Sequence, residues 1–221
     1  MIRIFLGLWL YFPVVAFSQY PDAAILKKLK VKRITEESEG RERIFFYDNE
    51  GFEYGHIDKS YPNLGYERKI YYNASKRPDS IRIIYQNKDR TGKITYRYKA
   101  DGSYTRITSS CIKIDKVDYC GTDSALIGRF NKIQWEVAHN GGKTTFEYDA
   151  KGNLVKSVDE KNGIVTRYTY NPSGKVEMCK ATNSNGTSTT TFSYGANNLL
   201  VKEVYISEGI QFTKNYTYQY Y

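Results

Sequence analysis

One short pattern that returns at a fixed spacing constrains this chain more than any other feature. A tyrosine, a polar turn and an aliphatic residue follow one another at 148–154, 170–176 and 194–200, and Tyr218 begins a further copy. The steps between the four tyrosines are 22, 24 and 24 residues. A period of this size indicates a repeat architecture in which each unit packs against the next.

Each copy carries the residues of a type I turn that closes a hairpin through a bulge. Asn171 can bond back to the backbone, Pro172 presets φ, and Gly174 accepts a positive φ. Gly152 holds the last place in the first copy and Asn198 holds it in the third, because Asn also tolerates the left-handed region. Six residues are therefore predicted to have structural roles: Tyr148, Gly152, Tyr170, Gly174, Tyr194 and Asn198.

A second set of turns lies between these copies and leaves strands of seven or eight residues, which predicts an antiparallel meander. Alternation places Tyr168, Phe192 and Tyr216 on an aromatic face and leaves the opposite face rich in threonine. On the returning strands the same alternation predicts these apolar sets: Leu154 with Val158, Val176 with Met178, and Leu200 with Val204 and Ile206.

Residues 1–18 have the features of a secretory signal peptide. Arg3 supplies the positive start, Ile4 to Phe17 supply the apolar run, and cleavage is expected before Gln19. The run is too short for a comfortable membrane span, and no cysteine begins the mature chain as a lipoprotein anchor requires. We therefore expect export to the periplasm, the cell surface or the medium, with no transmembrane helix in the mature chain.

The remaining chain is predicted to hold an N-terminal segment, 19–40, and one repeat domain, 41–221. The segment is expected to contain a short helix at 22–29, a first strand at 31–35 and a charged turn at 36–40. Weaker copies of the pattern begin at Tyr47, Tyr72 and Tyr98, with alternate turns at 89–92 and 140–142. The fold class is all-β, with about thirteen or fourteen strands, and so large a twisted sheet must curl.

The cysteines allow one local interpretation. A two-residue turn at 115–116 would place Cys111 opposite Cys120 in a non-hydrogen-bonded pair, where antiparallel strands approach most closely. An oxidising compartment would permit a disulfide there, and two reduced cysteines are the alternative. Cys179 is interpreted as a small buried residue.

The repeated Tyr-Asp-x-x-Gly-x-Leu element resembles the YD repeats of the RHS (rearrangement hotspot) family. The match is good over 146–221 and weaker over 41–130. The resemblance implies a sheet of β-hairpin repeats, which long members use as a shell around a toxin or as a cell-surface module that binds carbohydrate. This chain has no toxin-cleavage motif, because Asn171 to Gly174 reads as an ordinary turn.

No catalytic, cofactor or metal site is nominated by the sequence. His56 and His139 are the only histidines, and neither has metal-ligand spacing around it. The formal charge of +9 is spread along the chain among acidic residues, which argues against a nucleic-acid partner. Weak attraction to anionic surfaces or polysaccharide is the alternative use of that charge.

Three functional hypotheses follow. The first is a non-enzymatic exported repeat protein with a binding or structural surface for carbohydrate or another cell-surface protein. The second is an outer-membrane-associated β-barrel, and the third is a glycan-active enzyme. If function is localised, it is expected where the pattern fails, between Tyr104 and His139.

Overall fold

The computed structural model describes residues 23–59, 66–74, 77–85, 88–114, 117–128, 132–138 and 140–221, and these residues are almost entirely antiparallel β. The signal-peptide prediction, His139 and the turn at 115–116 lie outside this part of the chain. The described elements are, in order, α2 (Ala23–Lys28), β1 (Val31–Ser38), β2 (Arg41–Tyr47), β3 (Glu53–Asp58), β4 (Tyr66–Tyr72), β5 (Pro78–Tyr85), β6 (Lys88–Tyr98), β7 (Tyr104–Ile114), β8 (Val117–Ile127), β9 (Ile133–Val137), β10 (Lys143–Tyr148), β11 (Leu154–Asp159), β12 (Ile164–Tyr170), β13 (Val176–Asn183), β14 (Gly186–Tyr194), β15 (Leu200–Ser207) and β16 (Ile210–Tyr220).

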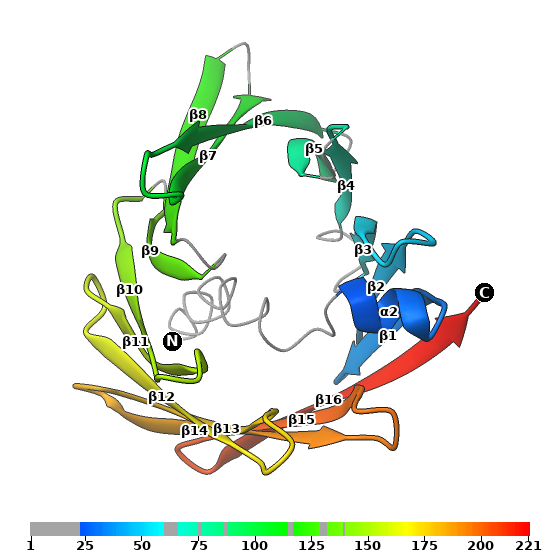
Figure 1. The fold of residues 1–221 in the computed structure, drawn as a ribbon, viewed down its shortest axis with the longest axis vertical. Coiled ribbons are helices and arrows are strands. Elements are labelled where there is room, and N and C mark those ends of the chain that lie inside the picture. Colours follow the sequence, from blue (N-terminus) through cyan, green and yellow to red (C-terminus); the bar gives the residue numbers. More distant parts are fainter. Residues whose placement is uncertain are drawn as a thin grey trace.

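The strands form one closed barrel, shown end-on in Figure 1. Each strand pairs with the next along the chain, and β1 pairs with β16 to complete the ring. The predicted meander is therefore confirmed, and closure is how the sheet encloses its apolar face. The predicted count of strands was too low, since sixteen lie within the described residues. Residues 89–92, expected to be a turn, lie inside β6.

A bulge in each repeat decides which side chains face inward on the returning strands. Glu147 pairs with Lys156 whereas Tyr148 pairs with Leu154, so Val155 has no opposite residue. The extra residue shifts the alternation by one position, and Leu154 and Ser157 are both buried.

The apolar sets predicted for the returning strands were therefore wrong. The bulge recurs at Glu177 and Val201, so Cys179 is buried in β13, and Ile206, expected beside Leu200, is 45% exposed. Uninterrupted alternation does not hold on a strand that contains a bulge.

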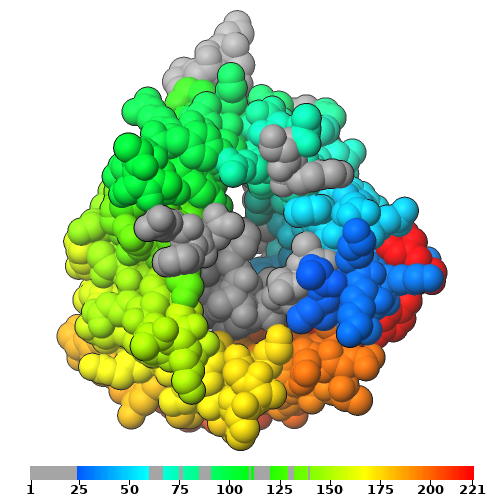
Figure 2. Space-filling model, in the orientation of Figure 1, coloured from blue at the N-terminus to red at the C-terminus, as the bar shows by residue number. Residues whose placement is uncertain are grey.

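The buried face lies inside the barrel. In the wall from β10 to β16, Tyr168, Phe192 and Tyr216 are buried, whereas Arg167 and Thr191 on the opposite face are exposed. Figure 1 shows no described segment outside this wall, so the buried face is the inner one. In Figure 2 the front rim of the barrel is hollowed between the green and cyan parts of the wall.

The N-terminal elements join the same core. Leu26 of α2, with 1% exposure, packs in one cluster with Val31 and Ile34 of β1 and with the aromatic residues of the wall. The backbone N–H of Tyr221 donates to the carbonyl of Lys30 at 2.7 Å, which continues the pairing of β16 past its end. The two ends of the described chain thus meet at one seam.

Candidate functional site

The residues singled out from the repeat pattern lie in or beside the turns of the repeats, and their tyrosines link neighbouring repeats. The hydroxyls of Tyr148, Tyr170 and Tyr194 donate to backbone carbonyls on the preceding hairpin, each at 2.9 Å. Their acceptors are Ile133, Leu154 and Val176, each the first residue of a strand. These bonds satisfy carbonyls beside the bulges, so the tyrosines act as structural links.

The turn residues have the backbone conformations expected of them. Gly152, Gly174 and Asn198 have φ of +86°, +76° and +57°. At Gly152 an added Cβ would also lie 1.7 Å from Nζ of Lys132, so the flexible lysine side chain would have to move. That ammonium donates to the carbonyl of Gly152 at 2.5 Å and lies 5.1 Å from the ring centre of Tyr148.

The three cysteines are structural as well. Cys111 and Cys120 form a disulfide, with their Cα atoms 4.0 Å apart. Cys179 is buried, and burial raises the pKa of its thiol from 9.0 to about 11, which the contact with Thr190 only partly offsets. A thiol with so high a pKa is protonated near neutral pH and is a poor nucleophile.

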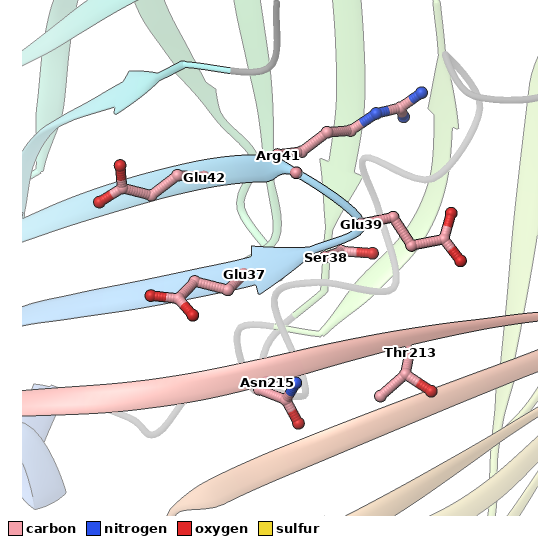
Figure 3. A pocket seen from close by; sticks show the side chains of 8 residues that line it. Glu37, Ser38, Glu39, Arg41, Glu42, Thr213 and Asn215 are labelled. Carbon is pink, nitrogen blue, oxygen red and sulfur yellow. The ribbon is translucent and has the colours of Figure 1, made fainter.

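A polar cleft opens at the seam where β1 and β16 separate. Their pairing ends at Glu37 and Asn215, and β1 then turns into β2 through Glu39 and Gly40 while β16 continues beside β15. The two hairpins diverge and leave a cleft of about 460 Å³. Figure 3 shows the side chains that reach it from β1, β2, β16 and the β1–β2 turn, including Thr213.

The lining of this cleft combines carboxylates with neutral hydrogen-bonding groups. The eight lining residues are Glu37, Ser38, Glu39, Gly40, Arg41, Glu42, Thr213 and Asn215. Three carboxylates and one guanidinium give the cleft an excess of negative charge on a chain whose formal charge is +9. Two cations pair with Glu42: Nζ of Lys59 lies 2.9 Å from its Oε2, and the guanidinium of Arg33 lies 3.7 Å from its Oε1. The negative excess of the lining therefore comes from Glu37 and Glu39.

Directly behind the cleft, on the inner face, an ionic network crosses the seam. Tyr216 of β16 donates its hydroxyl to Oε2 of Glu203 at 2.9 Å and lies 3.4 Å from Oε2 of Glu36 on β1. Lys214 Nζ lies 3.5 Å from Glu203 and 3.8 Å from Glu36.

The network continues from Glu36 into β2 and β3. Arg43 lies 3.7 Å from Glu36 and donates through Nε to Asp58 at 2.9 Å. The side chains of Glu36 and Asp58 are each only 7% exposed, so these contacts offset the cost of burying carboxylates. The network therefore fixes the β1–β16 register from inside and holds the cleft in shape.

Alternation along β1 creates the two-sided arrangement. Ile34 and Glu36 point inward, so Glu37, one residue on, points outward into the cleft. Residues 36–40 were predicted to form a charged turn, and this was wrong, because β1 runs to Ser38 and only Glu39 and Gly40 turn. The sequence did hint at a charged group on the inner face, because Lys214 lies two positions before Tyr216 and therefore faces the same side of the strand.

A second charged group lies in the wall formed by β7, β8 and β9, where the repeat pattern is irregular. Glu136 of β9 pairs with Ala125 of β8, which in turn pairs with Arg106 of β7. Burial raises the pKa of Glu136 from 4.5 to about 7. The guanidinium of Arg106 opposes this rise, and the carboxylate of Asp123 adds to it. Near neutral pH this carboxyl is therefore partly protonated.

The described residues contain no group of three or more His, Cys, Asp or Glu side chains arranged to hold a metal ion. His56 is buried and lies 3.0 Å, through Nδ1, from Oε1 of Glu53. Its ring centre is 5.3 Å from that of Phe45, so it packs in the wall. In the part of the chain that is described, no helix has the length and apolar character needed to cross a membrane.

Comparisons with known proteins identify the repeat. Residues 148–187 match the family model described as RHS Repeat. Among solved structures, a porin-like protein from Bacteroides uniformis is similar at 13% identity, with 86% of this chain and 98% of that chain covered and a TM-score of 0.41. The complex TcdB2-TccC3 is similar at 12% identity over 76% of this chain and 12% of that one, with a TM-score of 0.27. No curated protein matches this chain.

Proposed function

We propose that this chain, which carries RHS repeats of the YD type, is an exported, non-catalytic protein whose seam cleft binds a neutral or amine-bearing saccharide. The observation that carries the proposal is the cleft itself, because it interrupts the barrel wall and combines concavity with convergent polar side chains. Its volume of about 460 Å³ falls in the range of small-ligand sites.

The lining suits a ligand rich in hydroxyl groups. Carboxylate oxygens of Glu37 and Glu39 accept hydrogen bonds, and Asn215 and Thr213 can both donate and accept them. The negative excess disfavours acidic saccharides, because like charges repel at short range. A short neutral or amine-bearing oligosaccharide therefore fits the cleft better than an anionic one.

The non-catalytic part of the proposal rests on where the charged groups lie. Glu136, the carboxyl with a raised pKa, belongs to β9 and not to the lining of the cleft. The carboxylates that do line the cleft, at Glu37, Glu39 and Glu42, are grouped on the β1–β2 hairpin. A glycosidase needs two carboxyl groups on opposite sides of the scissile bond, which one hairpin does not offer.

Residues 1–18 support export, and the outer face of the wall supports an aqueous location. Arg167, Lys180 and Lys202 are exposed on the outer face, whereas a lipid-facing barrel presents an apolar band there. We therefore favour an aqueous location outside the cytoplasm over the outer-membrane alternative. N-terminal sequencing of the protein from its producing cell should begin at Gln19, and the mature protein should stay dispersed without detergent.

Calorimetric titration of the mature protein with neutral, amine-bearing and acidic oligosaccharides tests the binding site. Saturable binding is expected for a neutral or amine-bearing member and should be lost in the double variant Glu37→Ala/Asn215→Ala. Glu177→Ala removes an exposed carboxylate from the wall outside the cleft and should leave binding unchanged. Binding that survives the double variant, or that consumes the oligosaccharide, would contradict the proposal.

A further inference from the structure

A second cleft lies on the wall where β5, β6 and β7 run side by side. Its volume is about 390 Å³, and besides Gly92 it is lined by Asp79, Ser80, Thr91, Lys93, Ser109 and Cys111. We call it the disulfide cleft, because Cys111 is bonded to Cys120 of β8. It is separate from the seam cleft, since the two share no lining residue.

The disulfide cleft opens on the outer face of the barrel. Ile94 of β6 is buried at 7% exposure, so Lys93, one residue before it, points outward and is exposed. Lys93 lies opposite Ser109, and Thr91 lies opposite Cys111. Residues directly opposite one another on paired strands share a face, so the cysteine and the lysine lie on the same outer surface.

The disulfide lies where the hairpin of β7 and β8 leaves the wall. Pairing between β6 and β7 ends at Thr91 and Cys111, and pairing between β8 and β9 covers only Ser124 to Ile127. Figure 1 shows this end of β7 and β8 rising past β6 at the top of the view. Cys111 and Cys120 are both exposed, and exposed disulfides are the ones that thiols can reach and open.

The order of the strands decides which sulfur a bound thiol can attack. Exchange begins when a thiolate attacks one sulfur of the disulfide, along the line of the S–S bond and from the side away from the other sulfur. The cleft contacts Cys111 and extends from it toward β6 and β5, whereas Cys120 lies on the opposite side, on β8. A thiol held in the cleft therefore faces Sγ of Cys111.

The charges of the cleft define the rest of the ligand. Lys93 supplies an ammonium group on β6. Asp79 supplies a carboxylate, and it is exposed because it is the extra residue of a bulge in β5 and has no opposite residue on β4. Ser80 and Ser109, the residues paired with Lys93 on its two sides, add hydroxyl groups that donate and accept hydrogen bonds.

We propose that the disulfide cleft binds a small thiol that carries both an ammonium and a carboxylate group, and that this thiol forms a mixed disulfide with Cys111. The carboxylate of the ligand pairs with Lys93 and its ammonium group pairs with Asp79. A cleft of about 390 Å³ is large enough for a ligand of this size.

The exchange step is balanced without any further reactant. The thiolate of the ligand forms a new S–S bond to Sγ of Cys111, and the bond between Cys111 and Cys120 breaks. The electron pair of the broken bond leaves with Sγ of Cys120, which becomes a thiolate and takes a proton from water. The sulfur of the ligand is thereby oxidised from a thiol to a disulfide, and that of Cys120 is reduced.

Reduced glutathione is a suitable probe, because it carries one ammonium and two carboxylate groups. The folded, mature protein is incubated with an excess of it, quenched with acid and mapped by peptide mass spectrometry. The adduct is expected on Cys111, with Cys120 recovered as a free thiol. An adduct found mainly on Cys120, or no adduct on the folded protein, would overturn the inference.

A variant at Lys93 tests recognition by charge. Lys93→Ala should slow the opening of the disulfide by glutathione about two- to fivefold, the effect of one exposed ion pair, and should leave its opening by uncharged mercaptoethanol unchanged. Lys180→Ala removes an exposed lysine from β13 and should change neither rate. If Lys93→Ala alters neither rate, or slows both thiols equally, the cleft does not select the ligand and the proposal fails. Neither measurement depends on saccharide binding at the seam cleft.

Discussion

The regular wall from β10 to β16 and the irregular wall from β7 to β9 solve the same packing problem by different means. In the regular wall each repeat supplies a tyrosine whose hydroxyl bonds to the previous hairpin, as Tyr170 does to Leu154. In the irregular wall Ile127 occupies the equivalent place opposite the first residue of the next strand, and it has no hydroxyl to donate. The irregular wall has instead a disulfide, which joins the two strands of one long hairpin.

This comparison indicates what the repeat motif contributes. Where the motif is intact, stability comes from an inner cluster that spans many strands and includes Tyr168, Phe192 and Tyr216. Where it fails, the inner face carries charged groups such as Arg106 and Glu136. Four measurements can break or sharpen the contrast, from the largest expected effect to the smallest.

The largest effect is expected at the centre of the regular wall. Phe192, 6% exposed, belongs to the main cluster, so Phe192→Ala should lower the free energy of unfolding by about 3–5 kcal/mol. Ile127 is as buried, at 4%, but lies outside that cluster, and Ile127→Ala should cost about 2 kcal/mol. Urea unfolding measures both, with the exposed Thr191→Ala as control. A larger loss at Ile127 would refute the contrast.

The second effect belongs to the irregular wall. The double variant Cys111→Ser/Cys120→Ser should lower the free energy of unfolding by about 2–3 kcal/mol, because the bond restricts the unfolded chain. Reducing agent should destabilise the wild type by a similar amount and leave the double variant unchanged. Equal stability of the oxidised wild type and the variant would show that the disulfide does not replace the missing bond.

The third test concerns the tyrosine links. Tyr170→Phe removes the hydroxyl that bonds to Leu154 and leaves that carbonyl without its partner, which should cost about 1–2 kcal/mol. Tyr98 in the weaker repeat is 58% exposed, and Tyr98→Phe should change stability by less than about 0.5 kcal/mol. Thermal unfolding of both variants gives the comparison. Equal effects would mean that the hydroxyl link is unimportant.

The smallest effect is a pH dependence of the irregular wall. Because the pKa of Glu136 is raised from 4.5 to about 7, the folded state binds a proton that the unfolded state has released between these values. The resulting stability is present below about pH 4.5 and is lost as the pH rises through about 7. The loss should be about 1 kcal/mol after allowance for solvent screening.

Glu136→Gln isolates that contribution, since glutamine keeps the size of the side chain and does not titrate. Unfolding curves of the variant should lose the part of the pH dependence that falls between these two values. Glu177→Gln, at an exposed site on β13, should keep the wild-type profile. A wild-type profile in the Glu136 variant would place the pH dependence elsewhere.

The seam shows where prediction from the sequence stopped. Lys214 could be predicted to face the inside of the sheet, because it lies two positions from Tyr216. Its partner Glu36 could not be predicted, because it is 178 positions away in a segment interpreted as a turn. Only closure of the ring brings β1 beside β16 and places Glu36 within reach of Lys214 and Tyr216. Contacts made by ring closure have no local signature, because no spacing in the chain encodes them.

The sequence alone determined the repeat, its turns and the aromatic face of its forward strands, because turn chemistry and alternation are local. Gly174 and Asn198 have the positive φ that their places in the motif require. The tertiary structure decided the faces of the returning strands, since a bulge at Val155 shifts the alternation only when the opposite strand is in place. It also decided that the sheet closes, that a cleft forms at the seam and that the edge of β8 projects, because each depends on where a neighbouring strand ends.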